Sequence, residues 1–101
     1  MGAHVAFHPA AAEEFLAAVD YYRAALPELG ERFAAAVRHA TDVVAAHPDA
    51  GSPRGTSVVR RLVVIGFPYD LVYWQRGETV EIIALAHHRR RPNYWRDRRQ
   101  G

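Results

Sequence analysis

The sequence predicts an α+β domain in which a short N-terminal strand and an antiparallel helical hairpin precede a three-stranded, mainly antiparallel sheet and a short C-terminal helix. Three observations predict this class. Apolar residues recur at helical spacing on both sides of Pro27, proline and glycine cluster in residues 47–55, and three later stretches are rich in β-branched and aromatic residues. The 101 residues, 50% of them hydrophobic, suffice for a single domain over residues 1–101.

The first half of the chain contains the predicted edge strand, residues 4–7, and both helices. Pro9 suits the first position of a helix, and we expect that helix to end near residue 25, before Pro27. Its apolar stripe is predicted to be Ala12, Phe15, Leu16, Val19, Tyr22 and Leu26. The second helix is predicted over residues 28–46, with an apolar stripe of Leu29, Phe33, Val37, Ala40, Val43 and Val44.

The second half is predicted to contain three strands, at residues 58–65, 69–75 and 80–86. Short turns at residues 66–68 and 76–78 join them, so adjacent strands should be antiparallel. Pro92 then permits a short terminal helix that carries Tyr94, Trp95 and Arg96.

Both faces of this predicted sheet are apolar, because alternate residues of a strand point to opposite faces. The expected groupings are Val59, Val63 and Ile65 against Val58, Leu62 and Val64; Leu71 and Tyr73 against Val72 and Trp74; and Val80, Ile82, Ala84 and Ala86 against Ile83 and Leu85. One helical hairpin can cover only one face. The other face needs either a partner protein, which is our interpretation, or the terminal helix folded back upon it.

Charge divides the chain unevenly, since residues 1–53 carry a net charge of −4 and residues 54–101 a net charge of +6. Six of the thirteen basic residues lie in the last fifteen positions, beside a single acid, Asp97. Such a positive field attracts a polyanion or an acidic partner, although a basic tail can also serve only to keep a protein in solution.

Composition also excludes several classes of protein. The absence of cysteine excludes a disulfide scaffold, thiolate zinc sites and cysteine nucleophiles. No apolar run reaches the ~18 residues of a membrane span, and the N-terminus lacks a secretory signal pattern. We therefore expect a cytoplasmic protein with no membrane partner. Because four of the six histidines, His4, His8, His39 and His47, are scattered, we expect neither a metal site nor a cofactor.

Several stretches carry a resemblance to a known family. They are PELGERF at residues 27–33, HPDAG at 47–51 followed by Pro53, RRL at 60–62, FPY at 67–69 leading to VY at 72–73, and AHHRRRP at 86–92 followed by YW at 94–95. In this order and spacing, the chain resembles the ParE/RelE toxins of type II toxin–antitoxin systems, small bacterial proteins with the same order of elements. One departure is His8-Pro9, where Ser-Pro or Thr-Pro is more usual, which leaves the cap of the first helix in question.

The resemblance implies a growth-inhibiting toxin that forms a hetero-oligomer with a cognate antitoxin, whose acidic or amphipathic segment covers the active face. It allows two mechanisms. RelE-like members cut messenger RNA in the ribosomal A site, whereas ParE-like members inhibit DNA gyrase without nuclease chemistry. RelE-like catalysis uses several lysines and this chain has none, so the ParE-like mechanism is favoured. A third interpretation, a non-catalytic nucleic-acid-binding module, depends only on the +5 charge of residues 87–101.

These mechanisms assign different residues. Metal-free RNA cleavage needs a base, cations for the phosphorane and an acid for the leaving oxygen. If the protein is RelE-like, the candidate catalytic residues are His88, His87, Arg61, Arg89 and Tyr94. If it is ParE-like, the candidate target-binding residues are Arg60, Arg89, Arg90, Arg91, Trp95 and Arg96. Because neighbours on a strand face opposite ways, only one of His87 and His88, and one of Arg60 and Arg61, can enter a given site.

Overall fold

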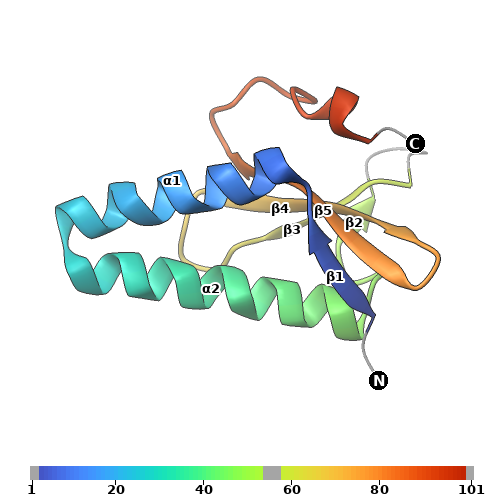
Figure 1. The fold of residues 1–101 in the computed structure, drawn as a ribbon, viewed down its shortest axis with the longest axis horizontal. Helices are drawn as coiled ribbons and strands as arrows, with labels where there is room; N and C mark the ends of the chain where they lie inside the picture. Colours follow the sequence, from blue (N-terminus) through green and yellow to red (C-terminus); the bar gives the residue numbers. More distant parts are fainter. Residues whose placement is uncertain (1–2, 54–57, 100–101) are drawn as a thin grey trace.

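The computed structural model describes residues 3–53 and 58–99. Its elements, in chain order, are β1 (His4–Phe7), α1 (Pro9–Ala25), α2 (Pro27–Ala46), β2 (Ser52–Pro53), β3 (Arg60–Val63), β4 (Tyr69–Arg76), β5 (Thr79–His87) and a 3-10 helix, η1 (Arg96–Arg98). The strands form one sheet in the order β1-β5-β4-β3-β2, with β1 parallel to β5 and the other neighbours antiparallel (Figure 1). The predicted α+β class is confirmed.

Two details of the strands differ from the prediction. The predicted turn cluster contains the two-residue strand β2, which pairs with β3; residues 54 and 55 of that cluster lie outside the described residues. The strand predicted over residues 58–65 is regular only from Arg60 to Val63.

The helical hairpin begins with a cap made by histidine. The Nδ1 atom of His8 accepts a hydrogen bond from the backbone N–H of Ala10 at 3.0 Å, so the imidazole replaces the usual serine or threonine oxygen. Leu26 is extended and separates the two helices, and Pro27 is the first residue of α2. The helices then pack closely, because a Cβ atom added to Gly30 would lie only 2.9 Å from the Cβ atom of Arg23.

The predicted apolar stripe of α2 is confirmed at its centre, whereas that of α1 is partly wrong. In α2 the fully buried positions include Phe33, Val37 and Val44. In α1, Leu16 is 61% exposed, and the buried residues are Ala11, Ala18 and Val19. The buried stripe of α1 is therefore rotated toward its alanines, which allow the helix to approach the sheet closely.

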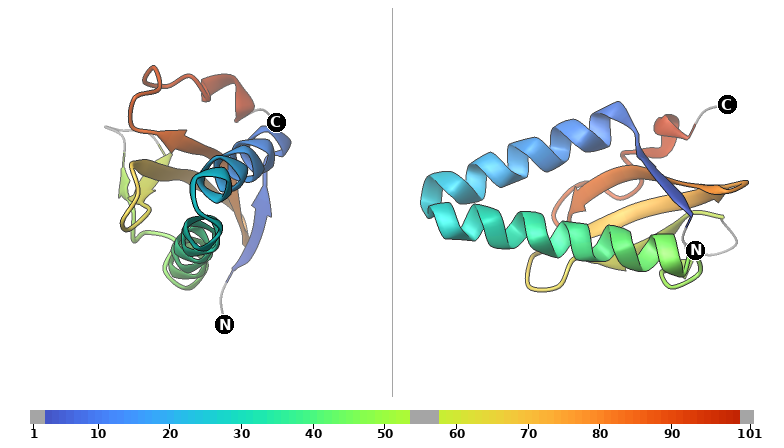
Figure 2. Two further views of the ribbon diagram at one scale, coloured as in Figure 1. Left: turned by 90° about the vertical axis from the view of Figure 1, so that its left-hand side faces the viewer. Right: turned by 60° about the horizontal axis from the view of Figure 1, so that its bottom comes forward.

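The hairpin packs against one face of the sheet, and the C-terminal segment lies on the opposite side (Figure 2, left). A β-bulge opposite Val72 and Tyr73 changes the alternation along β5. Leu85 consequently packs with the helices, while Ile83 and Ala84 both belong to the second face. The predicted grouping of Ala84 and Ala86 with Val80 and Ile82 was wrong, because both alanines lie on the second face. Strict alternation holds only where no extra residue is inserted.

The C-terminal segment covers part of the second face. Trp95 is buried there against Val59, Val72, Ile83 and Ala84. The predicted terminal helix is only the 3-10 helix η1, and both Tyr94 and Trp95 precede it. Val63 and Ile65 remain exposed at the end of β3. The terminal segment therefore folds back over the centre of the second face, as one of the two interpretations expected. It leaves apolar surface at the end of β3, which is the kind of surface that the other interpretation assigned to a partner protein. No helix of the described residues is long and apolar enough to cross a membrane.

Candidate functional site

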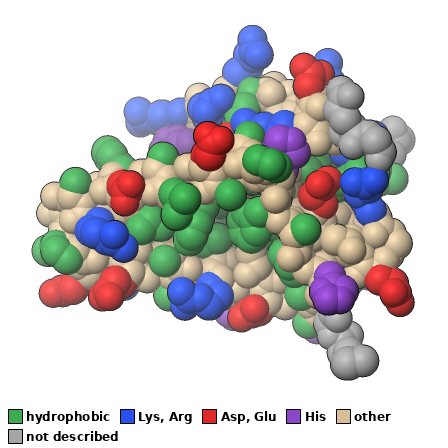
Figure 3. All heavy atoms as spheres, viewed as in Figure 1, with side chains coloured by type: hydrophobic (Ala, Val, Ile, Leu, Met, Phe, Trp, Pro, Cys, Tyr) green, Lys and Arg blue, Asp and Glu red, His purple; other side chains and the backbone are tan. Residues whose placement is uncertain are grey.

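The residues after β5 carry five exposed arginines, of which four form one surface and the fifth is Arg99. Arg89, Arg90, Arg91 and Arg96 form this basic surface, and blue side chains gather along the upper edge of the molecule, above β4 and β5 (Figure 3). Asn93 has a φ of 62°, a left-handed conformation that asparagine tolerates and that reverses the chain. Within residues 3–53 and 58–99, none of the four arginines forms an ion pair. Their charge is available to an acidic ligand.

Tyr94 anchors this surface to the rest of the molecule. Its ring lies 3.8 Å from the Arg90 guanidinium carbon and 5.0 Å from that of Arg98, both cation–π distances. Its hydroxyl donates a hydrogen bond to Glu14 Oε2 at 2.8 Å. Burial, together with that hydrogen bond, raises the pKa of Tyr94 far above its usual value of 10.0. A hydroxyl held in this way cannot readily transfer its proton to a leaving group near neutral pH.

Glu14 is a site residue that sequence reasoning missed. On α1 it lies three residues after Ala11 and four before Ala18, both of which are buried. A carboxylate on the buried stripe of a helix requires partners, since an unpaired buried charge is costly. This spacing from Ala11 and Ala18 was available in the sequence. The stripe predicted for α1 did not include these two alanines, so Glu14 was not recognised as lying on the buried face of the helix. The partners of Glu14, Tyr94 and Arg98, are 80 and 84 residues away.

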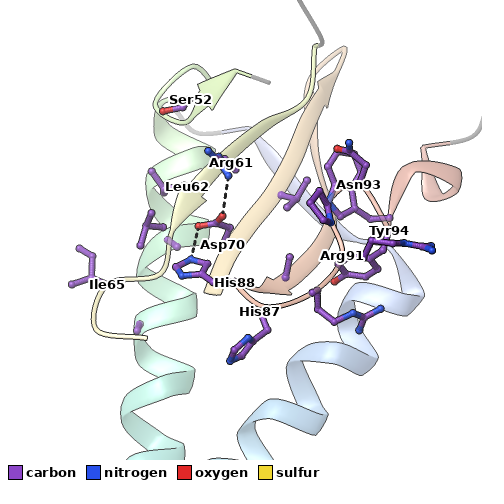
Figure 4. Close-up of a pocket in the computed structure, with 18 of the residues that line it drawn as sticks. Ser52, Arg61, Leu62, Ile65, Asp70, His87, His88, Arg91, Asn93 and Tyr94 are labelled. Atoms are coloured by element: carbon purple, nitrogen blue, oxygen red, sulfur yellow. Dashed lines mark hydrogen bonds and ion pairs between the residues drawn. The ribbon is translucent and has the colours of Figure 1, made fainter. Parts of the chain in front are cut away.

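A second polar cluster joins β3, β4 and the end of β5. Asp70 Oδ1 lies 3.0 Å from His88 Nε2, and Asp70 Oδ2 lies 3.6 Å from Arg61 Nη1. Figure 4 shows all three side chains meeting on one face of the sheet, while His87 points away from them. A carboxylate that orients an imidazole beside a guanidinium is an arrangement capable of proton transfer and phosphate binding.

The other candidate residues are directed elsewhere. The His87 ring makes an edge contact with Tyr69 at 5.0 Å, and its Nδ1 accepts a hydrogen bond from the backbone N–H of Arg89. Arg60 donates to the carbonyl oxygens of Gly51, at 2.7 Å, and of Asp49, at 3.2 Å. Trp95 is buried in the second-face cluster. The candidates are thus separated as strand alternation predicts, and the roles assigned to them remain predictions.

A groove of about 840 Å³ connects the Arg61–Asp70–His88 cluster with the basic surface. One wall comes from α2 and β3, and the other from the C-terminal segment (Figure 4). Apolar residues such as Val43, Leu62 and Ile65 line it together with Arg90 and Arg91. The arrangement suits a ligand that is apolar on one side and acidic on the other. Among the described residues, no group of three histidine or acidic side chains could hold a metal ion.

Comparison with known proteins identifies the family. Residues 5–92 match the family model described as the ParE toxin of the type II toxin–antitoxin system parDE. The chain belongs to the ParE toxin family. As a member of this family, it is the toxin component of a type II toxin–antitoxin system, and its partner is a cognate antitoxin.

A solved structure shares the fold of this ParE-family chain. The structure titled "Chromosomal ParDE TA system from P. aeruginosa" superposes with a TM-score of 0.75 at 18% sequence identity, covering 84% of this chain and 95% of that chain. No curated protein sequence matches this chain. The family resemblance predicted from the sequence is confirmed.

The structure explains one segment that carried the ParE/RelE resemblance. The loop that contains HPDAG is held from inside the molecule by Tyr73, whose hydroxyl donates to the carbonyl oxygen of Pro48 and accepts from the N–H of Gly51, both at 2.8 Å. Gly51 leaves no room for a side chain there, because an added Cβ would lie 2.7 Å from the Tyr73 oxygen. In this ParE-family chain, the motif therefore fixes the loop onto the sheet.

Proposed function

We propose that this ParE-family toxin inhibits DNA gyrase by binding it through the basic surface of Arg89, Arg90, Arg91 and Arg96. The observation that carries the proposal is the presentation of these four exposed arginines, without ion pairs among the described residues, on a segment fixed to the sheet by Trp95. A rigid cationic surface is suited to binding an acidic partner, and its fixed geometry lowers the entropic cost of binding.

The positions of the proton-transfer candidates also favour binding over RNA cleavage. The Tyr94 hydroxyl is bound to Glu14, and His87 and His88 point to opposite sides of the sheet. A general base, a general acid and phosphate-binding cations must converge on one phosphate for metal-free cleavage. Among the described residues, His88 and Arg61 meet at Asp70, but the Tyr94 hydroxyl is held by Glu14 and His87 packs against Tyr69, so no second proton-transfer group joins them.

The test replaces Arg89, Arg90 and Arg91 together by alanine. We expect the concentration needed to inhibit gyrase supercoiling by the purified toxin to rise roughly a hundredfold, if each exposed charge contributes up to about 1 kcal/mol. The matched control replaces Arg32 and Arg38, which are exposed on α2, and should inhibit as the unaltered protein does. Equal inhibition by the triple variant and the control would reject the proposed surface.

A second candidate function, RelE-like cleavage of messenger RNA on the ribosome, is favoured by the contact of Asp70 with both His88 and Arg61. Induction in a bacterial host separates the two mechanisms. A DNA-damage response with intact messages supports gyrase inhibition, whereas codon-phased cuts in ribosome-bound messages support cleavage. His88→Ala should abolish growth arrest if His88 is the base of a nuclease, and should leave it largely intact if the protein acts by binding gyrase.

A further inference from the structure

The inference begins with a difference in length between two paired strands. β1 pairs with β5 only as far as Phe7, which lies opposite Ile82, and the N–H of His8 donates to the Ile82 carbonyl oxygen. β5 continues to His87. Beyond Ile82, no strand within residues 3–53 and 58–99 pairs with this edge of β5, and its backbone groups require other partners.

Side chains from two distant parts of the chain supply those partners. The N–H of Leu85 donates to Glu14 Oε1 at 3.1 Å, and the carbonyl oxygen of Ile83 accepts from Arg98 Nη1 at 3.2 Å. Glu14 comes from the second turn of α1, and Arg98 from the 3-10 helix η1. Side chains thus replace the hydrogen bonds of a neighbouring strand along this edge of β5. One comes from a helix on one side of the sheet, and the other comes from the terminal segment on the opposite side.

Glu14 joins the two sides. Besides the bond from Leu85, its carboxylate accepts hydrogen bonds from Tyr94 Oη at 2.8 Å, Arg98 Nη1 at 2.9 Å and Arg98 Nη2 at 3.0 Å. Both oxygens are used, and the side chain is only 17% exposed. Bidentate, charge-assisted bonds of this kind fix the orientation of both partners.

The same bonds reach the basic surface. The ring of Tyr94 contacts the guanidinium groups of both Arg98 and Arg90, and Trp95, the next residue, enters the second-face cluster. Moving the charges of Glu14 and Arg98 out of water costs free energy, and this cost offsets much of their mutual attraction. We therefore expect the pair to contribute more to a defined geometry than to the net stability of the fold.

We propose that Glu14 is a positioning residue that holds the C-terminal segment in the conformation in which the basic surface contacts its target. This role rests on the proposed function, because it is expressed through target binding. Without the carboxylate, Tyr94 and Arg98 lose their common acceptor, and the segment detaches from the edge of β5. Trp95 alone cannot fix the direction in which Arg90 points.

The test compares Glu14→Gln with Glu13→Gln. Glu13 is the adjacent residue on α1, carries the same charge and is exposed, so its variant is a matched control. Trypsin reports detachment of the segment by cleavage after Arg89, Arg90 and Arg96, because cleavage follows the population of the open form. We expect cleavage about tenfold faster in Glu14→Gln than in the control, with the melting of helices and sheet shifted by only a few degrees.

Toxicity and gyrase inhibition are then measured for both variants. We expect Glu14→Gln to need about tenfold more protein for growth arrest and for inhibition of supercoiling, while Glu13→Gln equals the unaltered toxin. Tryptic cleavage at the control rate would overturn the proposal, and so would rapid cleavage with undiminished growth arrest. If the unaltered toxin arrests growth without inhibiting gyrase, the proposed function fails, and growth arrest still decides the role of Glu14.

A second variant covers the case in which Glu14→Gln melts early. Tyr94→Phe keeps the ring that contacts both arginines and removes only the hydroxyl that donates to Glu14. Its tryptic cleavage should lie between those of Glu13→Gln and Glu14→Gln at unchanged melting. Cleavage and potency that instead follow the melting temperature across all three variants would show that Glu14 acts only on overall stability.

Discussion

Replacement of Tyr73 by phenylalanine should lower the stability of the fold by about 2 kcal/mol. Tyr73 has no exposed surface, and its hydroxyl satisfies both the N–H of Gly51 and the carbonyl oxygen of Pro48. Removal of one oxygen leaves a space smaller than a water molecule, so the two backbone groups lose their partner without replacement. An unsatisfied buried polar group costs about 1–3 kcal/mol, and we count the partly buried Pro48 carbonyl at a fraction of that cost.

The assay is thermal and urea unfolding followed by circular dichroism. For a domain of about this size, 2 kcal/mol corresponds to a fall in melting temperature of roughly 8–16 °C. Tyr21→Phe is the matched control: Tyr21 is 71% exposed and its hydroxyl forms no hydrogen bond within the described residues, so we expect a change below about 0.5 kcal/mol. A Tyr73→Phe protein as stable as this control would refute the reasoning that the loop is held by this hydroxyl.

Three further predictions concern the same framework. Gly51→Ala should destabilise the protein by about 1–3 kcal/mol in urea unfolding, because the added Cβ would lie 2.7 Å from both the Arg61 carbonyl oxygen and the Tyr73 hydroxyl. A variant as stable as the unaltered chain would contradict this close packing. Trp95→Ala should cost about 3 kcal/mol through the cavity left on the second face, and a change below about 1 kcal/mol would mean that the segment is not docked there. Stability should also fall as the pH rises above 10, since burial raises the pKa of Tyr94 and Tyr73 above the value of 10.0 that we assign to the unfolded chain. Above pH 10 the unfolded chain releases protons that the folded chain retains, and this lowers the free energy of unfolding. Parallel urea titrations at pH 8 and pH 10.5 measure that free energy, and equal values at the two pH values would contradict the predicted pKa shifts.

The order of the elements could be predicted because it depends on local signals. Proline at both helix starts, the glycine- and proline-rich segment after α2 and the β-branched strands each act over a few residues. The bulge in β5 could not be predicted in this way. Nothing in the run from Val80 to Ala86 distinguishes an inserted residue, and the bulge exists only in the register between β4 and β5. One such residue reversed the predicted faces of Ala84, Leu85 and Ala86.

The candidate site was predictable to the extent that strand alternation controls it. The separation of His87 from His88, and of Arg60 from Arg61, follows from their adjacent positions. The partners of these side chains could not be predicted, because Asp70 and the carbonyl oxygens of the loop after α2 approach them only in the folded chain. Pairing over large sequence separations leaves little trace in a single sequence.

The bond between Glu14 and Arg98 has a consequence for the order in which the toxin is completed. It closes a loop of 84 residues, and contacts of such separation form late because their entropic cost must first be offset by the structure between them. During synthesis, residues 9–46 of the helical hairpin are made well before Tyr94 and Arg98. The arginine-bearing end of the molecule is consequently the last part to acquire its shape.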